Sequence, residues 1–208
     1  MKERMNTMKK IISLLLILCC FTMLFACTED PADNNGDNNN DNNAVTVADF
    51  NTAIANTKPT LTIITGKITS DLGVLNSKFE IAYNEDGSAV INCTYEKFNN
   101  IEDSTDVKTE YTATIVRNAD GTYVGAEGVD TSAVTAGTAI DLTKIADGAV
   151  TINEKGDTLT ATVVKADTEK VFGTAISADV ALTVAMNDGQ IDLIKLVFGA
   201  AEFTVQYQ

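Results

Sequence analysis

Residues 78–95 read KFEIAYNEDGSAVINCTY, and this stretch decides the fold class. Apolar and polar side chains alternate on both sides of the tripeptide 85–87 (EDG). A period of two is typical of a β-strand with one buried face, and Asp-Gly between two such runs indicates a tight hairpin turn. The stretch therefore predicts two antiparallel strands that bury a common face. The residues expected on that face are Phe79, Ile81, Tyr83, Ala89, Ile91, Cys93 and Tyr95.

The same pattern occupies most of the chain after Pro59. A first strand is expected from Leu61 to about Ser70. Further turns are predicted at the tripeptides 119–121 (ADG), 154–156 (EKG) and 187–189 (NDG), each between alternating runs. The intervals between turns differ, which excludes a solenoid or propeller repeat. The sequence thus predicts one antiparallel sheet of about eight to ten strands, with a threonine-rich polar face on many of them.

A single amphipathic helix is expected before the strands. Thr46 and Asp49 have the spacing of a capping box, and Val47, Phe50 and Ile54 then fall on one helical face. The dipeptide 58–59 (KP) should end the helix. Short helices are also expected at residues 141–146 and 168–172. The predicted fold is α+β and predominantly β, in which these helices pack against a large twisted sheet to form a half-barrel.

The first 26 residues have the pattern of an export signal. A basic start is followed by an apolar run over residues 11–25 and by the small residue Ala26. A transmembrane anchor is the alternative, but fifteen helical residues span roughly 22 Å, less than the ~30 Å hydrocarbon core of a bilayer. The acidic chain that follows also lacks a basic flank that would retain the segment in the membrane. A cleaved signal peptide is therefore favoured, with either Met1 or Met8 as its start.

Residues 24–27 (LFAC) resemble the lipobox of bacterial lipoproteins. In that motif Leu24 and Ala26 are the residues that signal peptidase II recognises, and Cys27 is the residue that is modified. The resemblance implies cleavage before Cys27 and attachment of diacylglycerol to its thiol. No other cofactor is expected. Multiple acyl chains hold a protein firmly on a membrane, since each buried methylene contributes ~0.8 kcal/mol.

The remaining chain divides into two parts. Residues 27–43 hold the modified cysteine and an Asn/Asp-rich segment with no large apolar side chain, which predicts a disordered tether. This segment lacks the glycine and glutamate positions of a calcium-binding loop, so no metal site is expected. Residues 44–208 form a single β-rich domain that is long enough to bury a core.

Charge and composition exclude several functions. Residues 1–26 carry four of the 15 basic residues and one of the 29 acidic ones, which leaves a formal charge of −17 on the rest. Such a surface should not bind nucleic acid, whose recognition needs cationic contacts to phosphate. Histidine and tryptophan are both missing from the chain. Catalytic triads and histidine-bearing zinc sites are therefore excluded.

No residue suggests catalysis. Cys93 lies in an alternating apolar run with no activating base in the sequence, so a buried core thiol is expected. Glu80, Glu96 and Glu110 fall at strand positions that should face solvent, without basic or aromatic neighbours to tune their acidity. We therefore expect a protein that is not an enzyme.

The order of lipobox, polar tether, amphipathic helix and β-hairpins resembles the LolA-like family of lipoprotein carriers and lipid-binding envelope lipoproteins. The resemblance implies that a concave sheet and its helices bind an acyl chain or other apolar ligand. The residues themselves suggest the same kind of site, since a curved sheet with a partial helical cover is a default ligand site. Simple core packing is the alternative role of the candidate lining residues. These are Phe50, Ile54, Phe79, Ile81, Tyr83 and Tyr95.

Two functions stay open on this basis. The first is an exported monomer, anchored by lipid to the cell membrane or the outer membrane, that binds a lipid or apolar ligand. The second is a structural or surface-interaction lipoprotein that contacts another envelope protein and has no small-molecule ligand. The amount of enclosed apolar space would distinguish them.

Overall fold

The computed structural model describes residues 44–70, 73–99, 107–120, 122–125, 140–146 and 148–208. The predicted signal peptide, with Leu24 and Ala26, lies outside these residues. So do Cys27 and the rest of the expected tether.

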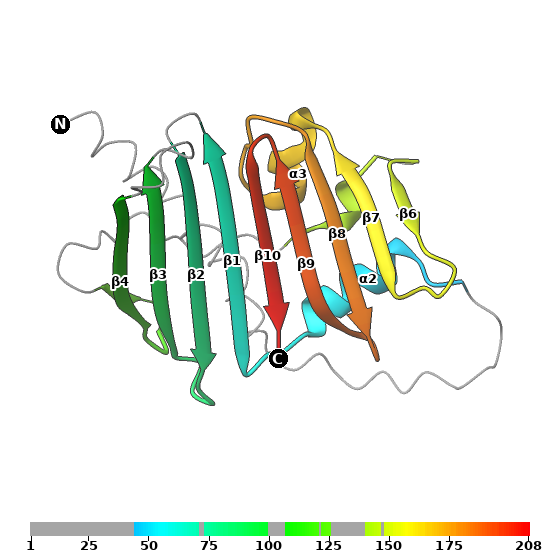
Figure 1. Ribbon diagram of the computed structural model, residues 1–208. Helices are drawn as coiled ribbons and strands as arrows, with labels where there is room; N and C mark the ends of the chain where they lie inside the picture. The colour runs from blue at the N-terminus through cyan, green and yellow to red at the C-terminus, as the bar shows by residue number, and fades with distance from the viewer. Residues whose placement is uncertain (1–43, 71–72, 100–106, 121, 126–139, 147) are drawn as a thin grey trace.

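Ten strands form one antiparallel sheet (Figure 1), which confirms the predicted class. The strands are β1 (Leu61–Ser70), β2 (Gly73–Tyr83), β3 (Ala89–Asn99), β4 (Val107–Arg117), β5 (Tyr123–Gly125), β6 (Val150–Ile152), β7 (Thr158–Val163), β8 (Val180–Asn187), β9 (Gln190–Phe198) and β10 (Ala201–Tyr207). Their order is β5-β4-β3-β2-β1-β10-β9-β8-β7-β6. The short strands β5 and β6 are the two edges, so the sheet is not closed into a barrel.

The sheet consists of two meanders joined at its centre. Strands β1 to β5 are neighbours in chain order, and so are β6 to β10. The first and last strands then pair with each other, with Thr62 opposite Tyr207 and Ile68 opposite Ala201. The ends of the domain are therefore side by side in the middle of the sheet.

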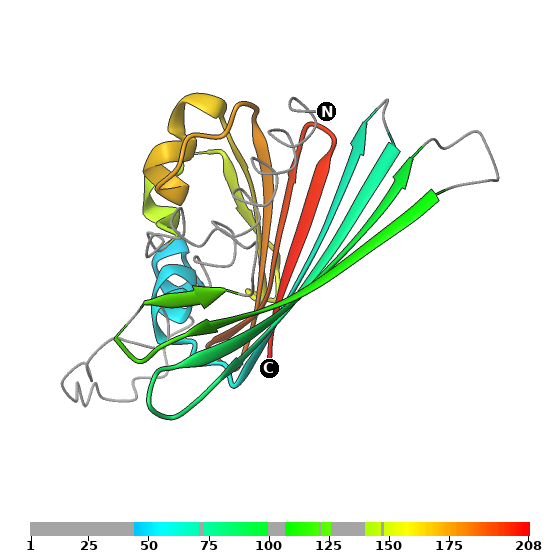
Figure 2. The same cartoon turned by 90° about the vertical axis from the view of Figure 1, so that its left-hand side faces the viewer.

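The helical elements of the described ranges lie on one side of the strongly twisted sheet (Figure 2). They are α2 (Val47–Asn56), the 3-10 turns η2 (Leu142–Lys144) and η3 (Lys165–Asp167), and α3 (Thr168–Phe172). The main contacts of α2 are with β8, β9 and η2. In Figure 1, the described helices lie behind β7 to β10 and none lies behind β2 to β4.

The predicted start of α2 is confirmed by its capping box. The Thr46 hydroxyl accepts a hydrogen bond from the Asp49 amide, and the Asp49 carboxylate accepts one from the Thr46 amide. These bonds satisfy amides that a helix N-terminus otherwise leaves free. At the other end the helix stops at Asn56, just before the Lys-Pro pair, as expected.

Helix α2 and the residues beside it are held to neighbouring elements at three points. The Thr57 hydroxyl accepts a hydrogen bond from the Ile191 amide at the start of β9 (2.9 Å). The Asn51 side-chain oxygen accepts one from the Leu142 amide of η2 (3.0 Å). Val45 packs against the β6–β7 turn so closely that a Cβ on Gly156 would lie 2.7 Å from its methyl carbon. The helix is thus fixed in place by polar bonds as well as by its apolar face.

The strand register separates two faces of the sheet. We call the face toward the helices the inner face; on it, Ile64, Phe79 and Cys93 are opposite one another and buried. Inner-face positions are odd-numbered on β2 to β5 and β10, and even-numbered on β1. The opposite, outer face carries exposed side chains such as Lys78.

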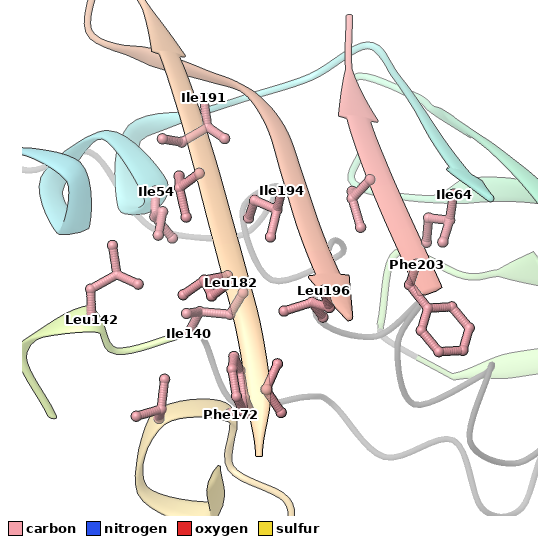
Figure 3. Packing of buried hydrophobic residues seen from close by; sticks show 14 of the residues in the cluster. Ile54, Ile64, Ile140, Leu142, Phe172, Leu182, Ile191, Ile194, Leu196 and Phe203 are labelled. Atoms are coloured by element: carbon pink, nitrogen blue, oxygen red, sulfur yellow. The ribbon is translucent and has the colours of Figure 1, made fainter. Parts of the chain in front are cut away.

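The core is one continuous cluster between the inner face and the helices. Figure 3 shows side chains from the helical elements meeting those of the central strands, among them Ile54, Leu142, Phe172, Leu182, Ile194 and Phe203. The Phe203 ring lies over Gly66 of β1, where an added Cβ would be 2.7 Å from the ring. Glycine is therefore required at this strand position because the ring occupies the space of a side chain.

The predicted turns and the short helices fit the structure. The tripeptides 85–87 and 154–156 lie between paired strands, and residues 188–189 join β8 to β9. The strands β4 and β5 lie on either side of the expected corner at 119–121, of which residue 121 is outside the described residues. The expected helix at 168–172 is α3, whereas only residues 142–144 of the expected 141–146 helix are helical.

The described fold is self-contained. Its strand pairings join residues 61–207, and the contacts of α2 add residues from Val45 onward. The described residues between 44 and 208 thus share one sheet, one helical layer and one core, which is the organisation expected of a single domain. None of the helices in the described ranges is long and apolar enough to cross a bilayer.

Candidate functional site

Four of the six predicted lining residues come together in the core. Phe50 and Ile54 of α2 and Phe79 and Ile81 of β2 are at most 2% exposed and belong to the same cluster. Both a packed core and an occupied ligand site require such burial. Their role as cavity-lining residues therefore stays a prediction.

The two predicted tyrosines lie at the margin of this cluster. Tyr83 is half-buried and packs against the core. Tyr95 occupies an inner-face position, between Ser77 on β2 and Tyr111 on β4. The structure describes its backbone but not its side chain.

The inner face has two chemically different halves. Its β7–β10 half is covered by the described helices and is lined by aliphatic residues and phenylalanine, such as Leu182, Ile194 and Phe203. The other half carries tyrosine. Four of the five tyrosines of the chain fall on inner-face positions of β2 to β5, namely Tyr83, Tyr95, Tyr111 and Tyr123, and the fifth, Tyr207 of β10, lies opposite Thr62 of β1.

This tyrosine half, the inner face of β1 to β5 with Tyr207, was not predicted as a unit. Each tyrosine sits in its own alternating run, and only the register between strands brings the five positions onto one face. Tyrosine has an apolar ring and a polar hydroxyl, so it is favoured on surfaces that are partly apolar and partly hydrated. The tyrosine half is therefore a candidate ligand surface.

Polar groups gather at one end of the tyrosine half. Tyr83, Ala89, Arg117 and Tyr123 form a row across β2 to β5. Arg117 is the sole arginine of the sequence after residue 26, and its guanidinium donates a hydrogen bond to the Gly87 carbonyl.

Thr62 and Tyr207 lie in the next row, beside Ile81. The pKa of the Tyr207 phenol is raised, first by burial and then by the nearby Tyr83 phenol. Thr62 is fully buried, and its hydroxyl has no hydrogen-bond partner in the described structure. We call Thr62, Tyr83, Arg117, Tyr123 and Tyr207 the polar end.

Cys93 is a buried thiol, as predicted. It is 3% exposed, and burial raises its pKa to about 12. A thiol with such a pKa is almost entirely protonated near neutral pH, where only the thiolate is a strong nucleophile.

The carboxylates with lowered pKa values have structural partners. Hydrogen bonds from Thr46, Ser88, Thr122 and Asn153 hold down the pKa values of Asp49, Asp86, Asp120 and Asp157, respectively, at a helix start or a turn. Glu80 differs from expectation, because the Lys78 ammonium lies 2.7 Å from its carboxylate. The prediction that Glu80 lacks a basic neighbour was wrong, since residues two apart on a strand lie on the same face. Within the described ranges, no group of three metal-ligating side chains occurs.

The outer face carries a second ordered feature. Nine adjacent strands of the sheet, from β4 near one edge to β6 at the other edge, each contribute one residue to a single row. The row is Thr112, Thr94, Lys78, Thr65, Thr204, Lys195, Thr183, Thr160 and Thr151. The sequence predicts a threonine-rich face, but its alignment into one row depends on the register.

No family model matches the chain, and no curated protein is significantly similar to it.

Proposed function

We propose that this protein is an exported lipoprotein, anchored through Cys27, whose domain binds an acyl chain or another apolar ligand at the tyrosine half of the inner face. The observation that carries the proposal is the position of the five tyrosines. All of them share one face, on the strands that lie beyond the main contacts of the described helices.

The chemistry of this surface suits a partly apolar ligand. Its centre is aliphatic, with Ile81, Ile91 and Ile115 opposite one another on β2, β3 and β4. Tyr83, Tyr123 and Tyr207 add rings with polar tips beside it, the mixture that ligand sites commonly use. The isoleucines are at most 1% exposed, so a ligand reaches them by displacing what packs on them.

Membrane anchoring rests on the lipobox-like residues 24–27. A lipid at Cys27 followed by the polar segment 28–43 would keep the domain near a membrane that contains acyl chains. The domain's acidic charge opposes direct adsorption to anionic lipid headgroups. Capture of single lipid molecules is therefore more consistent with this charge than binding flat on the bilayer.

A surface-interaction role is the second candidate. The row of seven threonines and two lysines on the outer face is the observation that favours it. In this role the inner face would be an ordinary core, and a protein partner would contact the outer face.

Native mass spectrometry of residues 44–208 distinguishes the two functions. The domain is mixed with 1-dodecanol, a fatty acid or a phospholipid, and the proposal predicts adducts with one bound ligand. Two adjacent substitutions on β4 supply a matched pair. Ala113→Trp adds a large ring to a half-buried inner-face position, and Thr114→Trp adds it to an exposed outer-face position.

The expected result is a loss of binding of about tenfold or more for Ala113→Trp, because the ring occupies the ligand's place, and a change of less than about twofold for Thr114→Trp. Circular dichroism checks that both variants stay folded. Absence of every adduct from the wild-type domain, or equal loss in both variants, would favour the surface-interaction role.

A further inference from the structure

We infer that one end of the outer face is a docking surface for a segment of another protein that combines apolar side chains with lysine or arginine. The inference is independent of the ligand proposal, because the two use opposite faces of the sheet. Three features support it: an uninterrupted apolar row, its exposure near the sheet edge, and the negative charge of the turns beside it. The row, which we call the apolar strip, consists of Leu61, Ala82, Val90, Val116 and Val124.

The apolar strip crosses β1 to β5, with one member on each strand directly opposite the next. Neighbouring strands are about 4.8 Å apart, so the strip is roughly 19 Å long. It ends beside Gln208, whose backbone N–H donates to the Leu61 carbonyl and whose carbonyl accepts from the Leu61 N–H. The adjacent outer-face row carries Thr114, Asn92 and Glu80. A continuous apolar row therefore differs both from its polar surroundings and from the scattered apolar side chains of ordinary surfaces.

The apolar strip is most exposed near the sheet edge. Val116 is 38% exposed and Val124 is 57% exposed, and only one other large apolar side chain of the described residues, Val164, is as open to solvent. Ala82 is also exposed. Threonine has the same β-branched shape as valine and suits an exposed strand position equally well. A partner that covers the valines instead gains the free energy of removing apolar surface from water.

Negatively charged turns border the apolar strip. The β2–β3 turn carries Glu85 and Asp86, and the β4–β5 turn carries Asp120. All three residues are exposed, both turns begin two residues beyond the strip, and neither turn contains lysine or arginine. Arg117 is the one cation between them, and it donates to the Gly87 carbonyl. Carboxylates therefore outnumber cations by two at this end of the sheet.

Charge selects the occupant of the apolar strip. A second copy of the chain would bring the same acidic turns, and the formal charge of −17 on residues 27–208 opposes the approach of two copies. Anionic lipid headgroups would be repelled in the same way. A polypeptide segment that has lysine or arginine beside its apolar side chains matches both features, since it covers the strip and places cations near the carboxylates.

Three synthetic peptides of eight residues test the inference. One alternates leucine with lysine, the second alternates serine with lysine, and the third alternates leucine with glutamate. An extended chain covers about 3.3 Å per residue, so each peptide is longer than the strip. Fluorescence anisotropy of labelled peptides measures binding to residues 28–208 in about 0.15 M salt, which screens the general charge of the chain. The inference predicts that the Leu–Lys peptide binds about tenfold more tightly than either of the others.

Variants assign this binding to the apolar strip. The double variant Val116→Thr with Val124→Thr keeps the side-chain shape, and it should weaken binding of the Leu–Lys peptide by about fivefold or more while leaving the Ser–Lys peptide unaffected. Val164→Thr is the matched control, because this valine is 45% exposed but lies outside the strip. Glu85→Lys should also weaken binding of the Leu–Lys peptide. Its control is Glu154→Lys, in the β6–β7 turn near the opposite edge. Both controls should change affinity by less than about twofold, and circular dichroism checks that all variants stay folded.

No binding of the Leu–Lys peptide, or equal affinity for the Leu–Lys and Ser–Lys peptides, would overturn the inference, since the strip would then add nothing to the charge. Equal losses in the strip variant and the Val164→Thr control would also overturn it. Each of these results leaves the ligand proposal standing, because that proposal is tested by 1-dodecanol and by Ala113→Trp on the inner face.

Two further measurements examine the other occupants. Sedimentation velocity of the wild-type chain should show a monomer, and a dimer that the double variant dissociates would assign the strip to a second copy. Flotation with phosphatidylcholine vesicles should leave the chain unbound, and vesicle binding that the double variant loses would assign the strip to a lipid surface. Either of these two assignments would overturn the inference.

Discussion

At the scale of single residues, two buried threonines differ in whether their hydroxyls have hydrogen-bond partners. Thr57 is 3% exposed, yet its hydroxyl donates to the Ala53 carbonyl (2.7 Å) and accepts from the Ile191 amide (2.9 Å). Thr62 is equally buried and has no partner among the described residues. The Thr57 hydroxyl is therefore satisfied by two backbone groups, whereas the Thr62 hydroxyl is buried without a hydrogen bond.

Replacing Thr57 with Val should destabilise the domain by about 1–3 kcal/mol, because the Ile191 amide would stay buried without an acceptor. Urea denaturation of residues 44–208 measures the change. Thr52→Val is the control, because Thr52 also bonds to the carbonyl four residues earlier but is exposed. This control should differ from wild type by less than about 0.5 kcal/mol. Equal effects of both variants would show that the link from α2 to β9 is unimportant.

Residue roles were predictable from sequence only where they depend on near neighbours. The burial of Cys93 follows from its alternating run, and the Thr46–Asp49 cap follows from a spacing of three. The bond between Thr57 and Ile191 joins residues 134 apart, and the grouping of the tyrosines depends on strand order. No local pattern carries that information.

At the scale of elements, two of the hairpin turns share one construction. Residues 84–88 (NEDGS) and 118–122 (NADGT) follow the same pattern. In each, the third residue, Asp86 or Asp120, accepts hydrogen bonds from the amide and hydroxyl of the fifth, Ser88 or Thr122. Such Asx-type bonds fix the turn and thereby the register of the strands that it joins.

These turns should make stability depend on pH. The bonds lower the pKa values of Asp86 and Asp120 below their ordinary value of 3.8. A lowered pKa in the folded state adds stability above the unfolded-state pKa, and this stability is lost as the pH falls through the folded-state pKa. The double variant Asp86→Asn with Asp120→Asn should therefore be less stable than wild type at pH 6, and the difference should shrink near pH 2.5. Urea denaturation at the two pH values measures it. A difference that stays constant or grows in acid would contradict this account of the turns.

The elements themselves were largely predictable, but their arrangement was not. Alternation and Asp-Gly corners predict the hairpins of β2–β3 and β8–β9, since both signals are local. The pairing of β1 with β10 joins the two ends of the domain, and nothing in either strand specifies the other. The extent of the 141–146 helix was overestimated for a similar reason, because packing decides the ends of such short turns.

At the scale of the whole molecule, the sheet separates two surfaces. The outer face is polar and crossed by the threonine row, and the inner face is apolar with helices over one half and tyrosines on the other. The overall class, with one leading helix against a large antiparallel sheet, was predicted correctly. The division of the inner face was not, since it arises from the order of all ten strands.

The anchoring proposal predicts a specific loss of membrane attachment. Replacing Cys27 with Ala should abolish incorporation of labelled palmitate and release the exported protein from the membrane fraction, because the proposal assigns the diacylglycerol to this thiol. Metabolic labelling followed by fractionation tests both effects. Retention of the variant in the membrane at full precursor length would instead support a transmembrane anchor at residues 11–25.

The most direct test of the ligand proposal maps where an alkyl chain lies on residues 44–208. The domain is irradiated with a twelve-carbon alcohol that carries a diazirine at the end of its chain, and tandem mass spectrometry locates the labelled residues. The inner-face positions of β2, β3 and β4 are all odd-numbered. The account predicts labels at odd positions such as Phe79, Ile91 and Ile115, suppressed by excess unlabelled alcohol. Labels at even positions such as Lys78 and Thr114, or labelling that excess alcohol leaves unchanged, would contradict it.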